Sequence, residues 1–182
     1  MFSPSLKFGC NQCGECCRQM RIPLNHCDIQ RIQAHLPDIP PQAWLHVHPV
    51  ETSAQDAVWI EGHSSLLLLR VQAEDKACVF LKDNACSIYP VRPRVCRIWP
   101  FEQTEKELRI SPPHHLLVSL ACDRTPFREQ RQIKTEIIGS EAEYRAYRHL
   151  IKQWNHETHQ HPEKQSLLAF LDFLKAGESY AP

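Results

Sequence analysis

The residues best suited to chemistry lie near the start of the chain, where CNQCGECC, Cys10 to Cys17, holds four cysteines. Two residues separate Cys10 from Cys13, a spacing that lets both sulfur atoms reach one metal ion. Gly14 follows directly, and glycine readily takes the positive φ that turns backbone N–H groups toward thiolates. Cys16 extends the pattern to C-x2-C-x2-C, three ligands of the kind an iron–sulfur cluster uses. The stretch therefore predicts a metal site whose fourth ligand comes from elsewhere. Because adjacent side chains diverge, we expect one of Cys16 and Cys17 to face a second metal.

A second group of cysteines, Cys78, Cys86 and Cys96, lies in ACVFLKDNACSIYPVRPRVCRIWPF. Pro93 predicts a short helix from Arg94 to Trp99 that carries Cys96 and ends before Pro100. Four thiolates around a divalent metal or a [4Fe–4S]2+ core leave a net charge of about −2, which is costly to bury without compensation. Arginine is a suitable counter-charge and lowers thiol pKa values. We therefore expect the cofactor's charge to be balanced by two nearby side chains, Arg92 and Arg97.

The whole pattern resembles the CxxCxxCC cysteine-cluster family (YkgJ-like) of zinc- or iron-chelating proteins. The matching segments are F-x-C-x2-C-G-x-C-C at Phe8 to Cys17, C-x-F-L at Cys78 to Leu81, and C-x-I-Y-x2-R-P-x2-C-R-x-x-P at Cys86 to Pro100. The resemblance implies eight metal ligands: Cys10, Cys13, Cys16, Cys17, Cys78, Cys86, Cys96 and Cys122. Cys27 matches no part of the pattern and falls within a helical pattern, where a buried thiol suffices.

The family also resembles part of the flagellin lysine methylases, which are much longer proteins. The chain has only five glycines, and no two lie close enough for a phosphate-cradling loop. The sequence also offers no recognisable S-adenosylmethionine loop. Methyl transfer is therefore not expected of this chain.

Cysteine usage and the N-terminus indicate the compartment. Nine cysteines leave one thiol over in any all-disulfide scheme. The start, MFSPSLKFGC, lacks the features of a secretory signal, and the longest aliphatic run is Leu66 to Leu69. Clustered cysteines in a reducing compartment favour metal ligands or catalytic thiols over disulfides. We therefore predict a cytoplasmic protein that is not inserted in a membrane.

The charge balance of the sequence indicates which kinds of partner to expect. Lys plus Arg and Asp plus Glu number 21 each, so no overall field attracts nucleic acid or an anionic membrane. We expect no nucleic-acid partner, and consider a protein or an electron-transfer partner instead.

The sequence predicts an α+β fold: a small, irregular, cysteine-rich metal-binding body with short strands, followed by C-terminal helices. The cysteines end at Cys122, so we place a cysteine-cluster domain over residues 1–123 and a helical extension, packed on it, over 124–182. In the body, a helix capped by Asn25 is expected over 26–36, ending before the prolines from Pro37, and a short helix over 42–48. Strands are expected over 65–72, 77–81, 106–111 and 114–122, with a turn over 82–84.

The tail has three helix signals. Thr125-Pro126 is expected to open one helix, Ser140 with Glu143 to form the capping box of another, and Pro162 to begin a last one that ends at Gly177.

Several functional alternatives stay open. The favoured one is a metal-binding protein with a [4Fe–4S] cluster, or with a zinc or iron ion, and a redox or protein-modification role. A structural zinc module whose helical tail binds another protein is the main rival. An enzyme with a reactive thiol is the third, and no Ser/His/Asp or H-E-x-x-H pattern supports it. The thiolates suffice for two four-ligand sites or for one site with spare thiols.

Overall fold

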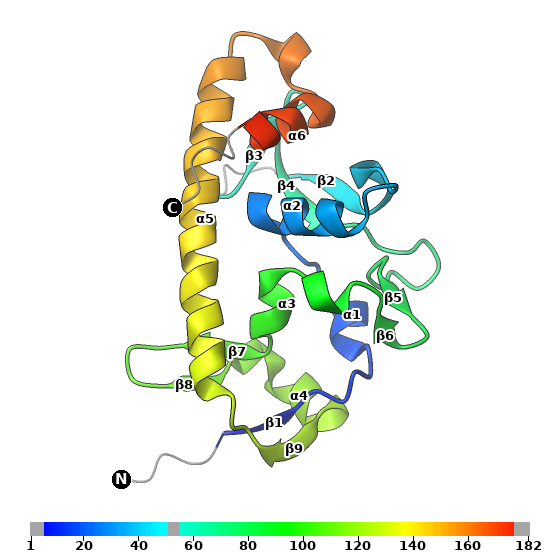
Figure 1. The fold of residues 1–182 in the computed structure, drawn as a ribbon, viewed down its shortest axis with the longest axis vertical. Coiled ribbons are helices and arrows are strands. Elements are labelled where there is room, and N and C mark those ends of the chain that lie inside the picture. Colours follow the sequence, from blue (N-terminus) through cyan, green and yellow to red (C-terminus); the bar gives the residue numbers. More distant parts are fainter. Residues whose placement is uncertain (1–5, 51–54, 177–182) are drawn as a thin grey trace. The chain divides into compact units, whose positions relative to one another are not determined.

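The computed structural model describes residues 6–50 and 55–176, and it has an α+β fold of helices and short antiparallel strands (Figure 1). The predicted fold class is thereby confirmed. The chain forms two compact units, one from Met1–Arg21 and Val71–Ser140 and the other from Ile22–Arg70 and Glu141–Pro182. Compact units are not necessarily domains that fold separately. The predicted domain boundary after residue 123 therefore stays a prediction.

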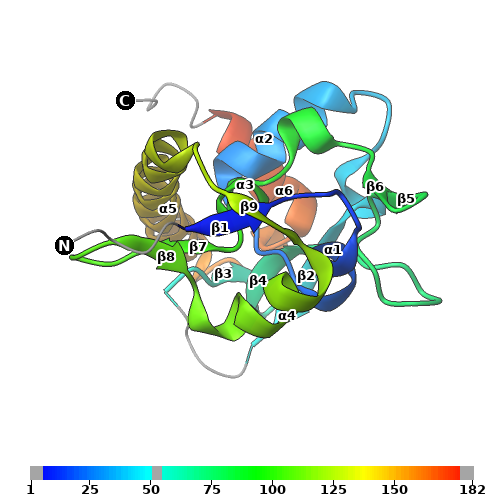
Figure 2. The same cartoon turned by 90° about the horizontal axis from the view of Figure 1, so that it is seen from below.

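The first unit contains the eight cysteines predicted as ligands. Its strands form three antiparallel pairs: β1 (Lys7–Gly9) with β9 (Asp123–Pro126), β5 (Leu81–Lys82) with β6 (Ala85–Cys86), and β7 (Phe101–Gln103) with β8 (Leu108–Ile110). Its helices are α1 (Glu15–Gln19), α3 (Arg94–Ile98), α4 (His115–Ala121) and the start of α5 (Gln130–Thr158), with 3-10 turns at Tyr89–Val91 and Pro112–His114. Figure 2 shows β1 and β9 side by side.

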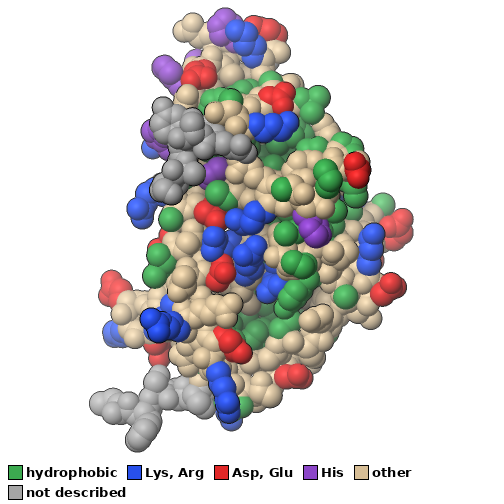
Figure 3. All heavy atoms as spheres, viewed as in Figure 1, with side chains coloured by type: hydrophobic (Ala, Val, Ile, Leu, Met, Phe, Trp, Pro, Cys, Tyr) green, Lys and Arg blue, Asp and Glu red, His purple; other side chains and the backbone are tan. Residues whose placement is uncertain are grey.

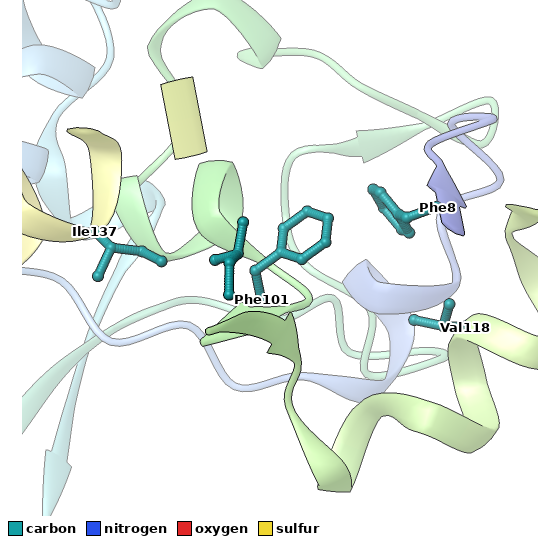
Figure 4. Packing of buried hydrophobic residues seen from close by; sticks show 5 residues of the cluster. Phe8, Phe101, Val118 and Ile137 are labelled. Atoms are coloured by element: carbon teal, nitrogen blue, oxygen red, sulfur yellow. The ribbon is translucent and has the colours of Figure 1, made fainter. Parts of the chain in front are cut away.

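A small aromatic core supports the first unit (Figure 4). Its buried members are Phe8, Phe101, Leu108, Val118 and Ile137, which come from β1, β7, β8, α4 and α5. The rings of Phe8 and Phe101 meet edge to face with centroids 5.1 Å apart, a favoured geometry for aromatic pairs. Since Phe8 stands two residues before Cys10, this core anchors the strand that leads into the cysteine cluster.

The second unit combines a three-stranded antiparallel sheet with helices. The sheet has the order β2 (Leu45–Pro49), β4 (His63–Leu69), β3 (Val58–Ile60). The helices are α2 (His26–His35), the end of α5, and α6 (Leu167–Ala176), with 3-10 turns at Pro41–Ala43 and Pro162–Lys164. The fully buried Phe170 packs edge to face on Trp154, at 5.2 Å between centroids.

Local signals predicted several elements correctly. Asn25 caps α2 through a reciprocal box with Asp28, as expected from its position before a helical pattern. Strand β8 and helix α3 lie within the predicted segments, and β4 overlaps the strand predicted over 65–72 but begins two residues earlier. The turn between β5 and β6 holds Asp83 and Asn84 at φ of 48° and 63°, the conformation a two-residue hairpin requires. These features depend on residues a few positions apart.

Other predicted elements were wrong. Residues 42–48 form no helix beyond a 3-10 turn, and β2 starts at Leu45. Most of the segment 114–122, predicted as a strand, is helix α4 (His115–Ala121), in which Val118 is buried while Leu116 and Leu120 are exposed. Most of 77–81 is irregular, with only the bridge Val71–Cys78 and the first residue of β5.

The helix starts predicted in the tail at Thr125-Pro126 and Ser140 were wrong, because α5 is continuous from Gln130 to Thr158. Thr125-Pro126 ends strand β9 instead of opening a helix, and Ser140 lies inside α5 and caps nothing. Gly139 does not break this helix. It lets the Arg94 guanidinium approach, since a Cβ there would lie 2.7 Å from Arg94 Nη1. Pro162 opens only a 3-10 turn before α6, and the predicted stop at Gly177 lies outside the described residues.

Among the helices of the described residues, none has the length and apolar character needed to cross a membrane. On the face drawn in Figure 3, basic and acidic side chains are interspersed, in keeping with equal numbers of each over the whole chain.

Candidate metal centre

The loop of residues 10–14, which carries the first cysteines of the predicted metal site and is called the knuckle, lies between strand β1 and helix α1. Gln12 and Gly14 have left-handed backbones, with φ of 57° and 78°, so the positive φ predicted for Gly14 is confirmed. These residues turn the chain around Cys13, whose N–H donates to Asn11 Oδ1 at 3.3 Å. A Cβ on Gly14 would lie 2.8 Å from Leu81 Cδ1. Glycine is therefore required both for the turn and for close packing on the β5–β6 hairpin.

Arg18, which the sequence reasoning missed, ties this knuckle to the hairpin. Its Nη1 donates to the carbonyl oxygen of Cys13 at 3.1 Å and to Glu15 Oε1 at 3.2 Å. Its Nη2 donates to Asn84 Oδ1 in the hairpin turn. The fork of a guanidinium suits such a multiple contact. The Glu15–Arg18 spacing was a visible signal for the local ion pair, but nothing in the sequence pointed to Asn84.

The pairing of strand β1 with strand β9 brings Cys10, the first cysteine of the chain, close to Cys122, the last. In the antiparallel pair of β1 and β9, Gly9 is opposite Asp123. Cys10 follows Gly9 directly and Cys122 precedes Asp123 directly, so both flank the same pair of opposed residues. The start of the cluster motif and the end of α4 thus lie together.

Further contacts join the segments around Cys10 and Cys122. Asn11 Nδ2 donates to the carbonyl oxygen of Ala121 at 3.0 Å. The pKa of Cys122 is raised to about 11, first by burial and then by the charges of nearby cysteines, of which Cys13 and Cys10 come first. Mutual repulsion of this kind requires thiols that are close to each other.

Cys78 is hydrogen-bonded to helix α1. Its N–H donates to the carbonyl oxygen of Cys17 at 2.8 Å, which fastens the second cysteine group to α1. Burial raises the pKa of Cys78 to about 11, and the charge of Cys86 adds to the rise. A hydrogen bond from the backbone N–H of Phe80 opposes it by favouring the thiolate. This N–H is the type of donor that supports a sulfur ligand.

Cys86 lies on β6 opposite Leu81. Its pKa is raised by burial, while the backbone N–H of Ile88 and the charge of Arg92 lower it. The Arg92 guanidinium stacks 3.7 Å from the centroid of the Tyr89 ring and donates to the Tyr89 carbonyl oxygen at 3.0 Å. A fixed positive charge thus acts on one of the predicted ligands.

Cys96 lies half-buried on α3, where its N–H donates to the Pro93 carbonyl oxygen at 2.9 Å. Arg97 Nε donates to the carbonyl oxygen of Arg92 at 3.0 Å, and Arg97 Nη1 lies 3.9 Å from Glu136 Oε1. Arg97 is therefore held beside Arg92 while facing an acidic neighbour. The roles of Cys96 and of both arginines toward a cofactor stay predictions.

Cys16 and Cys17 follow each other at the start of α1. A side-chain hydrogen bond with Cys17 is the largest cause that raises the pKa of Cys16, and burial is the next. The protonation of Cys16 therefore depends on its neighbour Cys17. That one of the two cysteines faces a second metal stays a prediction.

The thiols are neighbours, but their sulfur atoms do not converge on one point. Within residues 6–50 and 55–176, no three His, Cys, Asp or Glu side chains are arranged so that they could hold a metal ion. The donor set itself fits soft metal chemistry, because thiolates suit zinc and iron–sulfur centres. A metal bound by these thiols would require their side chains to rotate until the sulfur atoms reach ligand distance.

Cys27 lies apart in sequence and environment. It belongs to α2 in the second unit, whereas the other cysteines all belong to the first. Its Sγ contacts Nε2 of His26 at 3.3 Å.

Comparison with known proteins gives one match. The model of the family CxxCxxCC, described as "Putative zinc- or iron-chelating domain", matches residues 9–114. Neither the curated proteins nor the solved structures contain a match to the chain. The matched residues include every predicted ligand except Cys122, and the family description points to chelation of zinc or iron. Because the match covers more than half of the sequence, the chain belongs to the CxxCxxCC family.

Proposed function

We propose that the protein holds an iron–sulfur cluster of the [4Fe–4S] type, or a zinc or iron ion, through the cysteines of its first unit, and that it works in the cytoplasm. The observation that carries this proposal is the hydrogen bond from Cys78 N–H to the Cys17 carbonyl, 2.8 Å long. It joins two cysteine groups that are far apart in sequence. The proposed ligands are Cys10, Cys13, Cys16, Cys17, Cys78, Cys86, Cys96 and Cys122.

The electrostatics of the thiols support this proposal. Burial raises the pKa values of Cys78, Cys86 and Cys122, so bare thiolates are unfavourable there. A bound cation removes this penalty, because its charge favours the deprotonated sulfur. Arg92 already favours the thiolate of Cys86. The site is therefore suited to thiolates that are compensated by a metal.

The ligand spacing favours iron–sulfur over a single ion. C-x2-C-x2-C supplies three sulfur ligands from one short segment, as iron–sulfur proteins do, and a fourth comes from a distant segment. Such a cluster would exchange electrons with a protein partner, and this makes a redox role the first to test.

A structural zinc module is the second candidate, and one observation favours it. Leu168 on α6 is 58% exposed although Leu171 and Leu174 on the same helix are buried. An exposed leucine in the tail suits contact with another protein. In this case zinc would stabilise the fold without chemistry at the metal.

Anaerobic purification followed by metal analysis and a visible spectrum tests the proposal. A brown protein with iron and acid-labile sulfide supports the cluster, and a colourless protein with stoichiometric zinc supports the module. Native mass spectrometry that finds only the bare polypeptide, folded and reduced, would contradict both. Fast-reacting thiols in that apoprotein would point to thiol chemistry instead.

A further inference from the structure

Cys10 and Cys122 are opposite each other on two antiparallel segments of the first unit. In the pairing of β1 with β9, Gly9 is opposite Asp123. Antiparallel segments run in opposite directions, so the residue after Gly9 is opposite the residue before Asp123. These two residues are Cys10 and Cys122. The strand register therefore makes the two cysteines a cross-strand pair.

A hydrogen bond keeps the same register on the other side of the two cysteines. One step further along, Asn11 is opposite Ala121, and Asn11 Nδ2 donates to the carbonyl oxygen of Ala121 at 3.0 Å. The backbone of Cys122 is extended, with φ of −109° and ψ of 154°, so Cys122 continues the direction of β9 beyond the end of α4. Contacts on both sides thus hold Cys10 and Cys122 in opposition.

This opposition matches the geometry of a disulfide. Directly opposed residues of an antiparallel pair have Cα atoms about 4.5–5.5 Å apart, and their side chains lie on the same face. Disulfides join residues whose Cα atoms are about 4.4–6.8 Å apart. Cys10 is exposed and Cys122 is half-buried, so a reagent in solution reaches Cys10 first.

We infer that Cys10 and Cys122 form a disulfide when the metal-free chain meets a small-molecule disulfide such as glutathione disulfide, and that this bond opposes metal binding at the cluster. The second part rests on the proposed function, in which both cysteines are metal ligands. The first part rests on the strand register and the Asn11 contact alone.

The disulfide forms by thiol–disulfide exchange in two steps. The Cys10 thiolate attacks one sulfur of glutathione disulfide, which gives a mixed disulfide and releases one glutathione thiolate. The Cys122 thiolate then attacks the Cys10 sulfur and releases the second glutathione thiolate. The two protons lost by the protein thiols go through water to the two glutathione thiolates. Both protein sulfurs are oxidised, glutathione disulfide is reduced to two glutathione molecules, and neither cysteine is left as the thiolate that binds metal.

Mass mapping of the oxidised protein tests the bond. The reduced, metal-free full chain is incubated with glutathione disulfide, its remaining thiols are alkylated, and it is digested with trypsin. Trypsin releases Cys10 in peptide 8–18 and Cys122 in peptide 110–124, so the bond joins these two peptides, and fragmentation identifies the linked sulfurs. This link is expected to be the main one in the wild-type chain. An alkylated Cys122, or Cys10 linked to another cysteine, would overturn the inference without the need for any variant.

Variants check that the link is specific to the opposed pair. Cys27→Ser, in the second unit, is the matched control and should form the link as the wild type does. Cys10→Ser should lose it, and Cys122→Ser replaces this variant if circular dichroism shows that Cys10→Ser does not fold. Peptide 110–124 linked to a different cysteine at the wild-type level in Cys10→Ser would overturn the specific pairing.

Zinc titration followed by native mass spectrometry tests the opposition to metal. The linked chain is expected to bind less Zn²⁺ than the reduced chain, and dithiothreitol should restore the difference. Equal zinc binding by both forms would overturn the opposition to metal. Zinc on the reduced chain without any link under oxidation overturns the inference while the proposed function stands. A link in a chain that holds neither zinc nor iron when reduced overturns the proposed function and leaves the disulfide in place.

Discussion

The backbone N–H of Cys78 donates a 2.8 Å hydrogen bond to the carbonyl oxygen of Cys17, across a long stretch of sequence. Between these two residues the chain leaves the first unit and builds the helix α2 and the sheet of the second. The hydrogen bond closes this excursion at the cysteine cluster. Metal binding at the cluster should therefore stabilise tertiary structure as well as the local loops.

Substitution of a predicted ligand should reduce metal content and stability, whereas substitution of Cys27 should not. Cys13→Ser and Cys96→Ser are each expected to lose metal and to lower the melting temperature, because metal binding and folding are coupled. Cys27→Ser should keep the full metal content and change stability by no more than about 1 kcal/mol. Metal analysis and thermal unfolding on the same samples check this. Full metal content in Cys96→Ser would show that Cys96 is not a ligand.

Arg18→Lys should weaken metal binding without removing a ligand. Lysine keeps the charge but cannot contact the Cys13 carbonyl, Glu15 and Asn84 with one fork of donors. Residues that orient metal ligands typically contribute about 10- to 100-fold in affinity, and a loss in this range is expected in competition titrations with a chelator.

Arg21→Lys is the matched control for this change. Arg21 lies close by in sequence and donates at 3.1 Å to the carbonyl oxygen of Lys76, an exposed contact that includes none of the predicted ligands. Its affinity for metal should equal that of the wild type. Equal losses in both variants would assign the effect to the loss of any guanidinium near the cluster and not to the position of Arg18.

Gly14→Ala should destabilise the chain more than Gly62→Ala. Both glycines have positive φ, 78° and 79°, so each substitution costs about 1–2 kcal/mol of backbone strain. At Gly62 a Cβ would meet nothing within 4 Å, whereas at Gly14 it would lie 2.8 Å from Leu81 Cδ1. The difference between the two variants in urea unfolding measures this close packing. Equal losses would mean that the hairpin moves away freely.

His26 should make stability depend on pH. Burial lowers its pKa from 6.5, with Glu143 opposing and Arg31 adding to the shift, and the ring stacks on Tyr147. The unfolded chain therefore binds the proton more readily than the folded chain. The contribution of neutral His26 to folding stability is complete above the pKa of the unfolded chain. It is lost as the pH falls from there through the lower pKa of the folded chain.

Unfolding measured between about pH 7.5 and 5 checks the role of His26. His26→Gln should flatten the fall in stability on acidification. His63→Gln, at an exposed position on β4, should leave that fall unchanged. An unchanged slope in His26→Gln would assign the pH dependence to other groups.

Short-range chemistry determined much of what the sequence predicted. The Asn25 cap, the Asp83–Asn84 turn and the left-handed Gly14 each depend on neighbours a few residues away, so their signals are visible in the sequence. The α+β class and the family also follow from local patterns. The cysteine motif likewise indicated thiolate ligands from the sequence alone.

Tertiary structure decided the rest. The segment 114–122 is a helix whose only buried residue is Val118, so its pattern of apolar residues did not reveal which face meets the core. Gly139 lies inside α5 at a point where Arg94 packs closely against it, and Arg18 reaches Asn84 from a distant part of the chain. Such contacts join residues far apart in sequence. No local pattern contains them, since they exist only once the chain has folded.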